Sequence, residues 1–147
     1  MPDPAEPIPP PPPLASPQPD FSSRPASTGL PSNVAAALAS IPLVGGIIFY
    51  VLEKQDSFVR FYAMQSIIFG GVWILFSIVH SIAHAILTPI PAIGLIFTII
   101  LGIAWALISL AFLVVFIITI VKAFTGVRWD IPYIGPMARK QVDGATS

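Results

Sequence analysis

Uncharged residues dominate the middle of the chain. Residues 61–121 contain no Asp, Glu, Lys or Arg, which makes an uncharged stretch of 61 residues. A helix needs about 20 apolar residues to cross the hydrocarbon core of a bilayer. The stretch is therefore long enough for two crossings and too apolar for the surface of a water-soluble protein. The pattern predicts an all-α membrane protein with the lipid bilayer as its surroundings.

The first of three hydrophobic elements covers residues 33–52. Ser32 precedes it as a candidate helix cap, and the polar residues 53–56 end it in water. Pro42 and the Gly45-Gly46 pair lie in its middle, where they can kink the helix or break it into two half-helices. Two forms stay open, a kinked helix that crosses the membrane and a re-entrant element that does not.

The second and third elements cover residues 58–87 and 91–124. Each is about 30 residues long, or roughly 45 Å if helical throughout, which exceeds the bilayer core. The Thr-Pro-Ile-Pro sequence at residues 88–91 favours a turn between them. We expect a long antiparallel hairpin, and about three hydrophobic helices in all, because dividing the third element into two crossings would take about 40 residues.

The two ends of the chain differ from this middle. Residues 1–31 hold 12 of the 17 prolines and predict a disordered, proline-rich tail. Residues 32–124 form the predicted transmembrane domain. Residues 125–147 mix aromatic and apolar residues with Arg128, Arg139 and Lys140, and predict an interfacial amphipathic segment with a basic terminus. Because this segment holds two prolines, we expect it to be irregular and not a continuous helix.

Basic residues predict the orientation of the chain, since Lys and Arg are enriched in cytoplasmic loops. If three helices cross, one side carries six basic residues and the other carries Arg24 alone. If the first element is re-entrant, all seven lie on one side. Either arrangement predicts a multi-pass membrane protein with a cytoplasmic C-terminus. The six residues are Lys54, Arg60, Lys122, Arg128, Arg139 and Lys140.

Composition excludes several classes of function. The formal net charge is zero and no Lys/Arg cluster is present, so we expect no nucleic-acid partner. With no cysteine, the chain has neither a thiolate metal site nor a thiol nucleophile. It also lacks a Ser-His-Asp grouping and a glycine-rich phosphate loop followed by Lys. We therefore predict that the protein is not an enzyme and needs no cofactor.

One short pattern occurs three times, at residues 41–45 (Ile-Pro-Leu-Val-Gly), 90–94 (Ile-Pro-Ala-Ile-Gly) and 131–135 (Ile-Pro-Tyr-Ile-Gly). Proline stops or starts a helix, and glycine permits the turn. We interpret each copy as an apolar bend, and keep a re-entrant pore element as the alternative.

Small and polar residues lie on one stripe of each long helix. On the second element the stripe includes Ser66, Gly70, Ser77, His80 and His84, and on the third it is Gly94, Thr98, Gly102 and Ala106. Small residues let two membrane helices approach closely. The hairpin would then pair His84 with Gly94, His80 with Thr98, Ser77 with Gly102, and Trp73 with Ala106.

Four side chains are candidates for binding or partner contact. His80 and His84 have the i, i+4 spacing of metal ligands, but no carboxylate or cysteine is near enough in the sequence to complete a site, so we predict no metal. Arg60 sits at the entry of the second element beside Phe58, Phe61 and Tyr62, which suit an interfacial anchor. Gln65 lies one turn further in, where its amide needs a partner.

Three segments together resemble the Tic-twenty-like family of small membrane proteins. They are LPSNVAAALASIPLVGG from Leu30, FVRFYAMQS from Phe58, and IPYIG from Ile131. The resemblance implies a subunit of the bacterial cytoplasmic membrane that assists protein translocation or membrane assembly, with Arg60 and Gln65 at a cytoplasmic mouth. We also expect the protein to self-associate or to join other membrane proteins. The alternative function is a small oligomeric solute or ion channel built around Ser77, His80 and His84.

Overall fold

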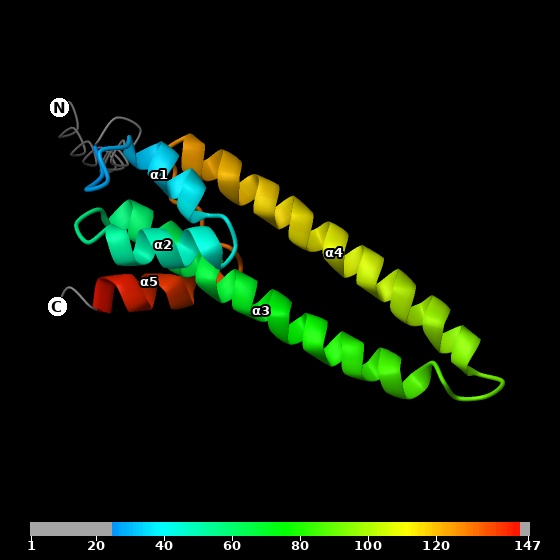
Figure 1. The fold of residues 1–147 in the computed structure, drawn as a ribbon. Coiled ribbons are helices and arrows are strands. Elements are labelled where there is room, and N and C mark those ends of the chain that lie inside the picture. The colour runs from blue at the N-terminus through cyan, green and yellow to red at the C-terminus, as the bar shows by residue number, and fades with distance from the viewer. Residues whose placement is uncertain (1–24, 145–147) are drawn as a thin grey trace, which may run out of the picture.

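The computed structural model describes residues 25–144, which form five helices and no strand. The helices are α1 (Ser32–Ala39), α2 (Val44–Leu52), α3 (Ser57–Leu87), α4 (Gly94–Phe124) and α5 (Ile134–Gly144). As Figure 1 shows, α3 and α4 form a long hairpin, and the three short helices gather at its open end. Most of the predicted tail lies outside the described residues, but residues 25–31 form a turn in which Ala26 is buried.

The two long helices confirm the predicted hairpin. Each has 31 residues and is long and apolar enough to cross a membrane, and within the described residues these are the two that are. Asp56 caps α3, because its carboxylate accepts hydrogen bonds from the backbone N–H groups of Phe58 and Val59. All-α architecture is therefore confirmed, with two long helices in place of the three hydrophobic helices that we expected.

The first hydrophobic element is broken at Pro42. Its two helices, α1 and α2, have 8 and 9 residues, so each is only about 12–14 Å long and too short to cross a bilayer. Leu43 between them has a φ of 63°. The bend reaches α3 near Gly70, where an added Cβ would lie 2.6 Å from the Leu43 side chain. The structure therefore has two half-helices here, and not one kinked helix that crosses the membrane.

The three Ile-Pro-x-x-Gly copies fold into the same kind of bend. In each, the residue after proline has a positive φ: 63° for Leu43, 67° for Ala92 and 68° for Tyr133. In each, a helix then begins at the next residue or the one after it. The glycine is required by close packing, since a Cβ at Gly94 would lie 2.0 Å from the carbonyl oxygen of Thr88.

The buried core lies at one end of the hairpin. We call this part the head, made of α1, α2, α5, the part of α3 up to Gly70 and the end of α4 from Thr119. Its core contains the alanines of α1 and the first turns of α3. We call residues 71–118 the bare hairpin, because Gly94 in the turn is the one buried residue among them.

The segment after α4 does contain a continuous helix, so the expectation of an irregular segment is wrong. Pro132 lies before α5, and Pro136 is its third residue. A proline in the first turn of a helix costs nothing in hydrogen bonds, because the N–H groups there have no partner within the helix. α5 packs on the head through Gly135, Ala138 and Val142.

Candidate functional site

Three aromatic residues at the start of α3 form the centre of the head. Phe58, Phe61 and Tyr62 are all fully buried, and the Tyr62 ring meets the other two edge to face at centroid distances of 5.1 and 5.4 Å. We expected these side chains to anchor the helix in the membrane interface. The structure corrects this, because α1, α5 and the linker before α5 cover them.

Tyr62 and Gln65 hold the linker between α4 and α5 against α3. The Tyr62 hydroxyl donates to the carbonyl oxygen of Val127 (2.5 Å) and accepts from the N–H of Trp129 (3.2 Å). The Gln65 amide donates to the carbonyl oxygen of Trp129 (3.4 Å) and accepts from the N–H of Ile131 (3.2 Å). Gln65 is fully buried, and its amide finds its hydrogen-bond partners in this linker.

Two arginines lie over aromatic rings at the rim of the head. The Arg60 guanidinium lies 5.1 Å from the centre of the Tyr50 ring on α2. Arg128 lies 4.9 Å from the centre of the Phe61 ring and donates to the carbonyl oxygen of Ser57 (2.9 Å). Such cation–π contacts hold a charge at the boundary between apolar protein and water.

Glu53 connects the turn between α2 and α3 to the segment before α1. Its side chain is fully buried and accepts hydrogen bonds from the backbone N–H groups of Ser27 (2.6 Å), Gln55 (3.0 Å) and Asp56 (2.9 Å), and from the Ser27 hydroxyl. Burial raises the pKa of this carboxyl, but the hydrogen bonds together outweigh burial and leave the pKa below its ordinary value.

Ser66 and Gly70, two of the predicted packing residues, pack against the broken first element. The Ser66 hydroxyl donates to the carbonyl oxygen of Ala39 (2.7 Å). Gly46 of α2 approaches the same hydroxyl so closely that a Cβ there would lie 2.2 Å from it. Small residues on α3 do permit close approach, but the neighbour is the broken first element.

Aromatic side chains fill the space between α3 and α4. Trp73 lies 5.2 Å from Trp105 and 4.8 Å from Phe112 between ring centres, and Phe69 stacks on Phe112 at 4.6 Å. His80 contacts the carbonyl oxygen of Leu101 at 3.2 Å between Nε2 and O, where we expected Thr98. The bulky rings, and not the small residues, set the helix separation and the register.

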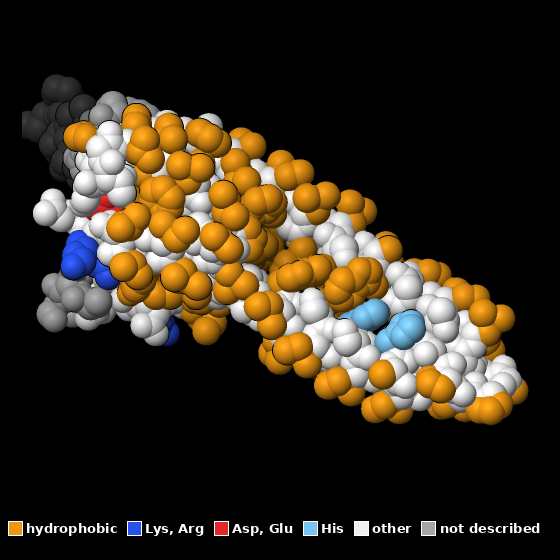
Figure 2. Space-filling model, viewed as in Figure 1, with side chains coloured by type: hydrophobic (Ala, Val, Ile, Leu, Met, Phe, Trp, Pro, Cys, Tyr) orange, Lys and Arg blue, Asp and Glu red, His pale blue; other side chains and the backbone are white. Residues whose placement is uncertain are grey.

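Nearer the turn, the two helices border an open groove of about 440 Å³. Figure 2 shows the two histidines together in this part of the molecule. Gly102 faces open space, with no atom within 4 Å of an added Cβ, and Ala106 is exposed. The groove is lined by His80, Ser81, His84, Ala85, Gly102 and Trp105.

The other predicted packing residues make local contacts. The Ser77 hydroxyl donates to the carbonyl oxygen of Trp73 (2.8 Å), and the Thr98 hydroxyl donates to that of Gly94 (2.9 Å). Gly94 itself packs on Thr88 in the turn. The hydroxyls of Ser77 and Thr98 therefore have partners within their own helices, which spares a polar group an unpaired position in an apolar environment.

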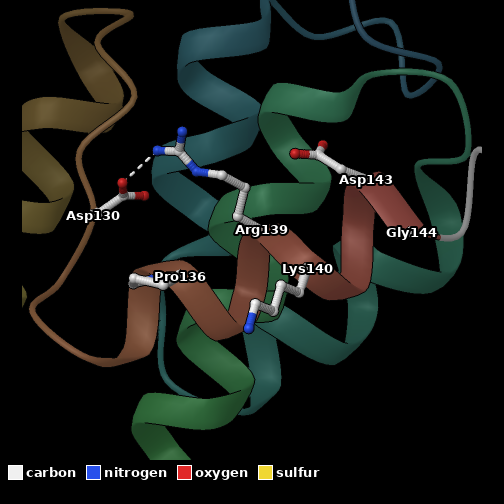
Figure 3. Close-up of a pocket in the computed structure, with 6 residues that line it drawn as sticks. All are labelled: Asp130, Pro136, Arg139, Lys140, Asp143 and Gly144. Carbon is white, nitrogen blue, oxygen red and sulfur yellow. Dashed lines mark hydrogen bonds and ion pairs between the residues drawn. The ribbon is translucent and has the colours of Figure 1, made fainter.

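A second hollow, of about 640 Å³, lies beside α5 and is lined by charged residues (Figure 3). In it Arg139 points to Asp130 and forms an ion pair, while Lys140 points away. Within residues 25–144, no three His, Cys, Asp or Glu side chains come together in a way that could hold a metal ion.

Sequence reasoning missed the polar residues that hold the head together. It took Glu53, Asp56 and Asp130 for solvated loop residues, and it gave no role to Asn33, whose amide donates to the carbonyl oxygen of Phe124 (3.0 Å). One signal was present. Asp56 directly before the apolar run of α3 is typical of a helix N-cap.

Comparisons with known proteins agree on one family. The sequence profile of the family described as the magnetosome magnetite crystal formation protein family matches residues 27–138. Two UPF0132 membrane proteins of Methanocaldococcus jannaschii are similar to the chain. One is 34% identical over 116 residues, covering 78% of this chain and 91% of the relative. The other is 33% identical over 122 residues, covering 82% and 77%.

A UPF0132 membrane protein of Archaeoglobus fulgidus is 36% identical over 115 residues, covering 76% of this chain and 96% of the relative. No solved structure matches the chain. The names of these relatives state a membrane location and no enzymatic activity.

The resemblance to the Tic-twenty-like family is wrong, because the three segments that suggested it all lie inside the match at 27–138, which assigns them to another family. From the profile match and the three relatives, the chain belongs to the magnetosome magnetite crystal formation protein family and is related to the UPF0132 membrane proteins.

Proposed function

We propose that the chain is a non-enzymatic subunit of a membrane assembly, and that its bare hairpin associates laterally with a second copy of the chain. The observation that carries this proposal is the unequal packing of the two halves. The head has a buried core and holds its own linker by internal hydrogen bonds, whereas the bare hairpin buries Gly94 alone. Membrane helices associate through close packing and polar contacts, and the groove with Gly102 and the two histidines offers both.

In this proposal α3 and α4 cross the cell membrane, and the head with the C-terminus lies at its cytoplasmic face. Among residues 25–144, every Lys and Arg lies in or beside the head, and the turn at residues 88–93 carries none. Figure 2 shows this concentration of charge at one end of an otherwise apolar surface. The rule that basic residues stay in the cytoplasm then sets the orientation.

Single cysteines test the orientation, because the chain has none of its own. Gln55→Cys places a thiol in the head, and Ala92→Cys places one in the turn. A membrane-impermeant maleimide added to whole cells should label Ala92→Cys at once and Gln55→Cys only after the cells are opened. Equal labelling of both in whole cells would contradict the crossing of the hairpin.

Cross-linking tests the lateral association. Gly102 and Gly71 both face open space, so a cysteine at either position leaves the packing unchanged. Oxidation in native membranes should give a disulfide-linked dimer for Gly102→Cys and none for the control Gly71→Cys. If Gly102→Cys is instead cross-linked to a different membrane protein, that protein and not a second copy is the partner at the groove. The absence of any adduct would refute lateral association at the groove.

The groove favours one second candidate, an oligomeric solute or ion channel. His80, Ser81 and His84 supply polar groups to the groove in a helix pair that is otherwise apolar. Conductance across planar bilayers that changes with His80→Ala would favour the channel, and bilayers that stay tight would exclude it.

A role in protein translocation is no longer supported, because the resemblance that implied this role is wrong and the Gln65 amide bonds to the linker. Magnetite crystal formation, which describes the family, is not carried to this chain.

A further inference from the structure

The cross-section of the molecule changes abruptly along the hairpin. The buried residues of α3 end at Gly70, and those of α4 begin again at Thr119, apart from Gly94 in the turn. On one side of this step, α1, α2 and α5 pack around the two long helices. On the other side, the bare hairpin continues alone to its turn, as Figure 1 shows.

The step falls near the middle of a bilayer. With 31 residues, α3 is about 46 Å long, close to the roughly 40–45 Å of a bilayer that includes its headgroups. Gly70 is 13 residues from Ser57, which places it about 20 Å along the helix. On the α3 side the head therefore fills the near leaflet. On the α4 side its buried residues begin at Thr119, about 8 Å from Phe124, so the head is shallower there. The far leaflet holds the bare hairpin alone.

The surface of the head within the near leaflet is apolar and suits contact with lipid. The two ends of α2 both expose apolar side chains, with Val44 65% and Leu52 57% exposed. Exposed apolar residues along the whole of α2 indicate that it lies within the near leaflet beside α3. The other exposed apolar residues of α2 are Ile47, Ile48 and Val51.

This asymmetry displaces more lipid from one leaflet than from the other. A helix with its side chains is about 10–12 Å wide, so each occupies roughly 100 Å² of a leaflet. Two helices cross the far leaflet, and α1 and α2 add about 200 Å² to the near one before α5 is considered. A bilayer with such an insert relaxes by bending so that the fuller leaflet becomes convex.

We propose that the protein is a membrane wedge, which concentrates where the leaflet that holds its head is convex. Its partner is a curved lipid surface. The inference rests on the proposed crossing of α3 and α4 and adds a preference for membrane shape that lateral association does not require.

Membrane tubes pulled from giant vesicles test this directly, because the outer leaflet of a tube is convex. The full chain is reconstituted in both orientations into vesicles of phosphatidylcholine with a minor share of phosphatidylglycerol. An impermeant dye added outside then marks head-out molecules in the Gln55→Cys variant and turn-out molecules in the Ala92→Cys variant. The two populations differ in orientation alone, so each is the matched control of the other.

Head-out molecules should be enriched in the tube about twofold or more relative to the parent vesicle, which corresponds to about 0.4 kcal/mol, and turn-out molecules should be depleted. Equal densities of the two populations, or enrichment of the turn-out molecules, would overturn the wedge. A hairpin that does not cross is detected separately by the whole-cell labelling of the same two variants, so failure of the proposed function and failure of the wedge are distinguishable.

Discussion

Replacing Glu53 by Gln should destabilise the head, although the two side chains have the same shape. The carboxylate accepts hydrogen bonds from three backbone N–H groups and one hydroxyl in a fully buried position. Its Oε2 faces the N–H of Ser27, and its Oε1 faces the N–H groups of Gln55 and Asp56. Whichever way a Gln amide is turned, its NH₂ group therefore faces at least one N–H donor.

The expected cost follows from these contacts. One buried N–H without an acceptor costs about 1–3 kcal/mol, and the bonds that remain lose the strength that the negative charge gave them. We expect Glu53→Gln to lower the free energy of unfolding by about 2–3 kcal/mol. For a chain of this size, a loss of about 2 kcal/mol corresponds to a fall of about 4–8 °C in the melting temperature.

Thermal melting in mild detergent, followed by circular dichroism, measures this change. Lys54→Gln is the matched control, since it alters one charge at the neighbouring exposed position and should shift the free energy of unfolding by less than about 0.5 kcal/mol. If Glu53→Gln melts at the same temperature as the control, the hydrogen bonds of Glu53 do not stabilise the head, and the predicted penalty for the unpaired N–H groups is refuted.

The pH dependence gives an independent check. Because the folded-state pKa of Glu53 lies below its ordinary value of 4.5, its contribution to stability is complete above that value. The contribution is lost as the pH falls from there through the lower pKa of the folded state. Melting temperatures of the natural chain should therefore fall more steeply in this acid range than those of Glu53→Gln, and parallel curves would contradict the assignment.

Three further changes test other parts of the structure. Gly45→Ala should destabilise the bend at Pro42 by about 1–3 kcal/mol in a melting experiment, because its Cβ would lie 2.2 Å from the carbonyl oxygen of Leu38. Gly71→Ala should leave the melting temperature unchanged or raise it, because the added Cβ meets no atom within 4 Å. The gain in the free energy of unfolding from helix propensity should be at most about 1 kcal/mol. Gln65→Leu should free the linker, because the N–H of Ile131 loses its acceptor. Hydrogen exchange at the amide of Ile131 should become faster, while exchange in the bare hairpin should not change. Unchanged exchange at Ile131 would contradict the role of Gln65.

The long helices were predictable because hydrophobicity and length determine them almost alone. In lipid, every backbone group must bond within its own segment, so an apolar run of about 30 residues leaves little choice but a helix. The turn at residues 88–93 was equally readable from its two prolines. The break at Pro42 was one of two open forms, and the sequence could not decide between them because a proline and two glycines allow both.

The packing of the helices was not predictable from the small residues. The spacing of Ser66 and Gly70 predicted a close contact, and that contact exists, but the spacing does not say which helix is the neighbour. The register of α3 and α4 depends on where Trp73, Trp105 and Phe112 fit between the helices, and ring packing is a property of three dimensions. The burial of Tyr62 and Gln65 likewise depends on α5 and its linker, which lie more than 60 residues away.

That distance along the chain has a consequence for biosynthesis. The first turns of α3 are complete early in synthesis, but the partners of Tyr62 and Gln65 are residues 127–131, which follow the whole hairpin. The Asn33 amide likewise donates to the carbonyl oxygen of Phe124, which is synthesised 91 residues later. The hairpin must therefore be made while the side of Phe58, Phe61 and Tyr62 that α5 and its linker cover is still open, and the head closes only after α5 has left the ribosome. A chain truncated before α5 would keep its crossing helices and present that aromatic surface to the cell's quality-control proteases.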